Sequence, residues 1–98
     1  MNTIKEEQKI VRALRQNHVT FAALFGSRAK DTAKKSSDYD FLIDTDPLTE
    51  FSLFDHVELK NELESTLKSK VDLVTVGGLN RHMRDNVTKT MKVIYDER

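Results

Sequence analysis

The segment LFGSRAKDTAKKSSDYDFLID, residues 24–44, joins an apolar run to a Gly-Ser pair and then to two aspartates one residue apart. Asp38 and Asp40 alternate with Tyr39 and Phe41, so in an extended chain both carboxylates point to one face of a sheet while the aromatic rings fill the other. Two like charges this close repel each other and cost free energy when they leave water. The pattern therefore predicts a strand whose polar face needs something positive to offset it.

The composition limits the classes of protein to consider. The chain has 98 residues and is expected to form a single domain, 1–98, with one modest core. Charged residues make up 33% and balance to zero net charge, which argues against direct nucleic-acid binding through bulk positive charge. The absence of cysteine excludes disulfides, thiolate zinc sites and cysteine nucleophiles. The N-terminal stretch MNTIKEEQKI lacks the apolar run of a signal peptide, and a soluble cytoplasmic protein is expected.

Apolar spacing and turn residues predict alternating helices and strands. The predicted elements are a helix from 4 to about 17, a strand at 19–25, a short helix at 27–33, a strand at 38–43, a helix from 53 to about 68, a strand at 70–76, a helix within 79–91 and a short last strand at 92–95. The first and third helices begin with capping boxes, Thr3 with Glu6 and Ser52 with Asp55. The order predicts an α/β (α+β) fold, a small mixed sheet of three to four strands packed with about four helices.

A third carboxylate, Asp72, interrupts the apolar run KVDLVTV, and a buried acid there needs a partner. Gly26 closes the first strand while Asp38 opens the second, so bringing these ends together requires antiparallel pairing. Asp72 lies near the start of the third strand, so bringing it to Asp38 requires parallel pairing. Three carboxylates at one sheet edge form a hard oxygen site suited to Mg²⁺ or Mn²⁺.

The Gly-Ser pair adds a candidate phosphate site. Gly26 lets backbone N–H groups approach a phosphate closely, and the Ser27 hydroxyl can donate to it at the start of a short helix. Arg28 is also placed to reach a phosphate. A phosphate cradle beside a two-metal carboxylate site indicates phosphoryl or nucleotidyl transfer.

These residues resemble a known motif. Gly26-Ser27, ten intervening residues and Asp38-Tyr39-Asp40 are similar to the G-S-x10-D-x-D motif of the DNA polymerase beta superfamily of nucleotidyltransferases. The segments LFGSRAK, SSDYDFLI, LKNELESTLKSKVDLVTVGGL and VIYDE resemble the minimal nucleotidyltransferase domain of prokaryotes, so the resemblance covers roughly residues 19–96. Asp31 departs from the glycine that members often carry there, although aspartate tolerates left-handed geometry.

The resemblance implies a role for each matching residue. Asp38 and Asp40 would bind two Mg²⁺ ions, with Mn²⁺ as a substitute. Asp72 would bind the catalytic ion and help to deprotonate the acceptor hydroxyl. Gly26 and Ser27 would bind the triphosphate of ATP.

The resemblance also implies a partner. Minimal domains of this kind typically pair with HEPN-domain ribonuclease toxins as antitoxins, and members transfer AMP from ATP to a tyrosine hydroxyl of the toxin. The expected function is therefore that of an Mg²⁺-dependent protein adenylyltransferase in a hetero-oligomer with a HEPN toxin. Two alternatives stay open: an antitoxin that only occludes the toxin, and a nucleotidyltransferase acting on a small-molecule acceptor such as an aminoglycoside.

Several of these residues also have a purely structural interpretation. Asp38 and Asp40 could form a solvated strand entry, and Asp72 could pair with Lys70 or Arg28.

Residues outside the motif are interpreted more simply. Asp44 and Asp46 are expected to be turn acids, and Phe51 and Phe54 are expected in the core or in a hydrophobic staple. The histidines show no metal-ligand spacing and are expected at the surface: His18, His56 and His82.

Overall fold

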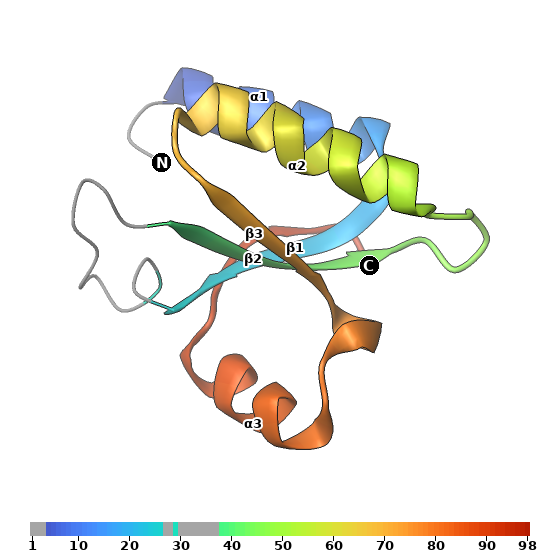
Figure 1. The fold of residues 1–98 in the computed structure, drawn as a ribbon, viewed down its shortest axis with the longest axis vertical. Helices are drawn as coiled ribbons and strands as arrows, with labels where there is room; N and C mark the ends of the chain where they lie inside the picture. Colours follow the sequence, from blue (N-terminus) through green and yellow to red (C-terminus); the bar gives the residue numbers. More distant parts are fainter. Residues whose placement is uncertain (1–3, 27–28, 30–37) are drawn as a thin grey trace.

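The structure is a computed structural model that describes residues 4–26, 29 and 38–98. Within these residues, a four-stranded sheet carries α1 and α2 on one face and α3 on the other (Figure 1). The elements are α1 (Ile4–Gln16), β1 (Val19–Phe25), β2 (Tyr39–Thr45), α2 (Leu53–Leu67), β3 (Val71–Thr75), the 3₁₀ turn η2 (Val76–Gly78), α3 (Arg81–Thr90) and β4 (Lys92–Asp96). The α+β fold predicted from the sequence is confirmed.

The sheet has the order β3-β2-β1-β4 and is mixed, as predicted. β1 pairs antiparallel with both β2 and β4, whereas β2 and β3 run parallel. The parallel pair is joined through α2, the kind of crossover that parallel neighbours require. β3 is therefore an edge strand, and its first residues lie beside the start of β2.

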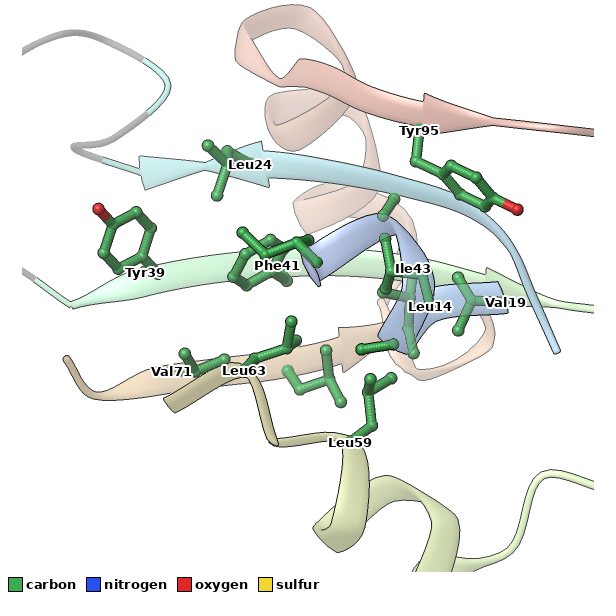
Figure 2. Close-up of a cluster of buried hydrophobic side chains, with 14 residues drawn as sticks. Leu14, Val19, Leu24, Tyr39, Phe41, Ile43, Leu59, Leu63, Val71 and Tyr95 are labelled. Carbon is green, nitrogen blue, oxygen red and sulfur yellow. The ribbon is translucent and has the colours of Figure 1, made fainter. Parts of the chain in front are cut away.

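The main core lies between the sheet and the helices α1 and α2 (Figure 2). Tyr39, Phe41 and Ile43 alternate along β2 and face these helices, where Leu59 and Leu63 of α2 are fully buried. Burial of each large apolar side chain contributes about 1.5–3 kcal/mol, so this layer supplies much of the stability.

A smaller core lies on the opposite face of the sheet. Phe21, Ala23 and Leu42 are buried there with Leu79 and Val87, the latter on α3. β1 is thus covered on both faces, which explains why its sequence VTFAALF is apolar at every position except Thr20.

The start of α2 is fixed by the predicted capping box. Ser52 Oγ accepts a hydrogen bond from the Asp55 backbone N–H at 3.2 Å, and the Asp55 carboxylate accepts one from the Ser52 N–H at 2.9 Å. Phe51 is half-buried and packs edge-on against His56, so it forms the expected staple. These contacts fix where the helix starts.

Three sequence-based expectations differ from the structure or lie outside the described residues. The short helix predicted at 27–33 lies, apart from Ala29, outside the described residues. β2 continues through Thr45, where a turn was expected from residue 44, because Thr45 still pairs with Val19. Phe54, expected in the core or a staple, is instead 86% exposed, because Phe51 already fills the staple position.

In the described part of the chain, no helix combines the length and apolar character needed to cross a membrane.

Candidate active site

The register of the sheet brings two of the predicted carboxylates together. Asp40 of β2 lies directly opposite Asp72 of β3, and on its other side it pairs with Phe25 at the end of β1. Asp40 and Asp72 alternate with core residues that face α1 and α2, so both carboxylates lie on the α3 face of the sheet. Asp38, just before β2, has the same parity. The antiparallel and parallel pairings inferred from the motif thus meet at one end of the sheet.

Within residues 4–26, 29 and 38–98, the negative charges at this end have no positively charged partner. Partial burial raises the pKa of the Asp40 carboxyl above its usual range, and the charges of Asp72 and then Asp38 raise it further. Across the described residues, no lysine, arginine or histidine forms a salt bridge with any of the three carboxylates. The Lys70 pairing considered for Asp72 is not formed, and the alternative partner, Arg28, lies outside the described residues.

The chemistry of this donor set fits a hard divalent cation. Carboxylate oxygens are the ligands that Mg²⁺ and Mn²⁺ prefer, and a cation would relieve the repulsion around Asp40. Among the described residues, no group of three or more histidine, cysteine, aspartate or glutamate side chains is placed so that it could hold a metal ion by itself, and this includes the three carboxylates that were expected to converge. Mg²⁺ in nucleotide-dependent enzymes usually takes only one or two carboxylates and completes its shell with water and substrate phosphates. Asp38, Asp40 and Asp72 are therefore an open set of candidate ligands.

Gly26 lies against the Asp40 carboxylate, at a position where only a residue without a side chain fits. Its φ of +70° is a conformation that other residues rarely adopt, and a Cβ built there would lie 2.5 Å from Asp40 Oδ2. The sequence suggested glycine for close approach to phosphate, whereas the structure adds that glycine makes room for the Asp40 carboxylate. Ser27 and Arg28, the other two predicted phosphate ligands, lie outside the described residues.

Access to the carboxylates differs from the sequence-based expectation. Asp72 was expected to be a buried acid, but it is exposed because β3 is an edge strand. Asp38 is also exposed, and Asp40 is half-buried. The three carboxylates are therefore accessible from solvent rather than enclosed in the core.

Two residues of α2 hold the free edge of β3 on either side of Asp72. Glu64 Oε2 accepts a hydrogen bond from the Val71 N–H at 3.0 Å, and His56 Nε2 donates to the Leu73 carbonyl at 2.8 Å. The expectation that His56 is simply a surface residue is therefore wrong. Neither contact can be predicted from the sequence, because both depend on β3 being the edge strand next to α2. Only a prediction of the strand order could have indicated them.

Fold and site together define a nucleotidyltransferase of the polymerase beta type. The family described as polymerase beta nucleotidyltransferase matches residues 8–98, and the chain belongs to this family. The enzyme class predicted from the motif is confirmed.

Three similar proteins within or near this family carry more specific descriptions. The chain is 32% identical to the protein adenylyltransferase MntA of Thermococcus cleftensis, and the match covers 97% of each chain. It also resembles a chain of a toxin–antitoxin solved with AMP-PNP, with a TM-score of 0.77, 28% identity and coverage of 92% of this chain and 73% of that one. A third match comes from a Shewanella oneidensis complex of an MNT antitoxin with its tri-AMPylated HEPN toxin. Its TM-score is 0.70 and its identity 26%, over 94% of this chain and 71% of that one.

Proposed function

We propose that this protein is a single-domain, Mg²⁺-dependent adenylyltransferase that transfers AMP from ATP to a tyrosine hydroxyl of a HEPN toxin and so acts as its antitoxin. The observation that carries the proposal is the placement of Asp40 opposite Asp72, beside Asp38 and against Gly26. The relatives support the donor and the acceptor, since one was solved with an ATP analogue and another with an AMPylated HEPN toxin. We expect the reaction in the cytoplasm, where ATP is available.

The residues of the site suggest how the reaction would proceed. Asp38, Asp40 and Asp72 would hold Mg²⁺, which when bound would polarise the α-phosphate and stabilise the departing pyrophosphate. Asp72 would accept the proton of the tyrosine hydroxyl, which ionises only near pH 10 without help. The tyrosine oxygen would form a bond to the α-phosphorus while the bond from that phosphorus to the β-phosphate oxygen breaks. Gly26 would bring backbone N–H groups close to the phosphates, and Ser27 and Arg28 would bind them.

The experiment combines the purified protein with its cognate HEPN toxin, ATP and Mg²⁺, and measures the intact mass of the toxin. We expect a mass increase of one or more AMP units that disappears when Mg²⁺ is chelated. The Asp38→Asn/Asp40→Asn variant should lose this transfer by several orders of magnitude, because removing metal ligands costs several kcal/mol in the transition state.

The chain contains its own matched control. Asp44 and Asp46 form a second pair of aspartates one residue apart, at the opposite end of β2. Their side chains accept hydrogen bonds from the N–H groups of Thr45 and Leu48, and asparagine can keep both bonds. The Asp44→Asn/Asp46→Asn variant should therefore transfer AMP like the wild type. An unmodified toxin in the presence of the wild-type protein, ATP and Mg²⁺ would contradict the proposal.

A further inference from the structure

The first turns of α2 present apolar side chains to solvent. Leu53 is 78% exposed, Phe54 86% and Val57 47%, and Leu48 in the preceding turn is 94% exposed. Residues three or four positions apart are neighbours on a helix, so Leu53, Phe54 and Val57 form one continuous surface, here called the α2 patch. The other side of the same helix buries Leu59 and Leu63 against the sheet. An ordinary surface helix has one apolar stripe, whereas α2 has a second one that stays exposed in the part of the chain that the structure describes.

The fold does not require this patch. The capping box of Ser52 and Asp55 and the contact of Phe51 with His56 already fix the start of α2. Single exposed apolar residues are common on protein surfaces, but an adjacent group built around an aromatic ring is typical of the centre of an interface.

The charge around the α2 patch indicates what kind of surface would cover it. Residues 46–67 contain six acidic residues and one basic residue, Lys60, although the charges of the whole chain balance. Glu58 and Glu62 are exposed on α2 beside or beyond the patch, and Glu50 is exposed just before it. A partner with an apolar centre bordered by lysine or arginine would complement this arrangement.

We propose that the α2 patch is the docking surface for the toxin, whose contacting surface carries basic residues around an apolar centre. This inference rests on the proposed function, because that function supplies the occupant. A second copy of the chain would oppose one acidic segment to another, and an anionic membrane surface would be repelled by the same charges.

The α2 patch is separate from the site. The carboxylates lie on the α3 face of the sheet, whereas α2 covers the other face (Figure 1). The C-terminal end of α2 leads into β3 near Asp72, and Phe54 lies about 20 Å from that end along the helix axis. Substitutions in the patch therefore leave the carboxylates and Gly26 untouched.

The test measures the Kd for the toxin by calorimetry, with Phe54→Asp as the main variant. We expect at least a tenfold increase in Kd, since burying a new carboxylate at the centre of an interface is unfavourable. Ser65→Asp is the matched control, because it adds the same charge to an exposed position about three turns along the same helix and should leave Kd within twofold. Glu58→Lys should also raise Kd, by removing an acidic border residue. Melting temperature and ATP binding establish that each variant is folded.

The outcomes separate this inference from the proposed function. A wild-type protein that neither binds nor modifies the toxin overturns both. A wild-type protein that binds and modifies it, with Phe54→Asp binding as tightly, overturns the docking surface alone. If sedimentation shows a wild-type dimer that Phe54→Asp converts to a monomer, the occupant is a second copy and the inference is wrong.

Discussion

Burial and two neighbouring carboxylates disfavour the charged form of Asp40. The ionised Asp40 should therefore lower the free energy of unfolding by an amount that can be measured. Burial raises its pKa, and the charges of Asp72 and Asp38 raise it further. Because the folded-state pKa lies above the unfolded value, the folded protein binds more protons than the unfolded chain between these two values. The free energy of unfolding therefore falls as pH rises through that window, which begins near the ordinary value of 3.8.

We predict that Asp40→Asn stabilises the protein at pH 7 in metal-free buffer, by at most about 1 kcal/mol since the site is partly solvated. The gain should vanish below the ordinary carboxyl pKa, where both forms are neutral. Added Mg²⁺ should raise the melting temperature of the wild type more than that of the variant, because under the proposed function the cation would bind the folded site. Thermal unfolding at several pH values measures this, with Asp44→Asn as control. A destabilised Asp40→Asn would mean that the carboxylate supports the fold.

Gly26 can be tested in the same way. Gly26→Ala should cost about 1–2 kcal/mol through its positive φ alone, and its Cβ would additionally displace the Asp40 carboxylate. We predict lower stability together with a loss of AMP transfer larger than the unfolded fraction explains. Gly77→Ala is the control, since a Cβ at Gly77 meets nothing within 4 Å. Full activity in Gly26→Ala would show that Asp40 does not need this space.

The strand β3 connects α2 to the candidate site, because α2 contacts the unpaired edge of this strand on either side of Asp72. The hydrogen bonds from Val71 to Glu64 and from His56 to Leu73 hold the strand on both sides of Asp72. Leaving a strand N–H without its partner costs about 1–3 kcal/mol where it is buried, and less where water can replace the partner. The strand can then shift with its carboxylate.

We predict that Glu64→Ala weakens Mn²⁺ binding and raises the KM for ATP, whereas Glu64→Gln restores both, since the amide oxygen can still accept from Val71. A purely structural role would lower the melting temperature of Glu64→Ala without changing Mn²⁺ affinity in the folded protein. Electron paramagnetic resonance of free Mn²⁺ measures that affinity directly. Glu62→Ala, at an exposed position on the same helix, should bind Mn²⁺ and ATP like the wild type.

Among the helices and strands, the sequence was most informative where the pattern of apolar residues was regular along a whole element. Alternation along β2 and the apolar run of β1 predicted both strands, and the motif predicted their pairing. Positions decided by competition between elements were not predictable. Phe54 was expected in the core or in a hydrophobic staple, yet Phe51 occupies the staple position and Phe54 is exposed to solvent. His56 was likewise assigned to the surface, because its partner, the Leu73 carbonyl, is close only in the folded sheet.

For the whole molecule, the topology separates the candidate catalytic carboxylates from the proposed docking surface. The end of β1 and the starts of β2 and β3 place Asp40 and Asp72 side by side on the α3 face of the sheet. The helix α2, whose residues form the exposed patch, covers the opposite face of the sheet (Figure 1). Such a separation would let an antitoxin hold its toxin without blocking the site. It also makes catalysis and occlusion distinguishable by substitution.

We predict that the two groups of variants fail differently. Asp38→Asn/Asp40→Asn should bind the toxin with a Kd within about twofold of the wild type, because the α2 patch is intact, yet leave the toxin unmodified. Phe54→Asp should act mainly through a higher KM for the toxin, with a kcat far less affected than in the aspartate variant. Steady-state transfer of labelled AMP and growth of cells co-expressing the toxin provide the two readouts. If Asp38→Asn/Asp40→Asn restores growth as well as the wild type while the toxin stays unmodified, binding alone neutralises the toxin, and the occluding antitoxin is the correct description.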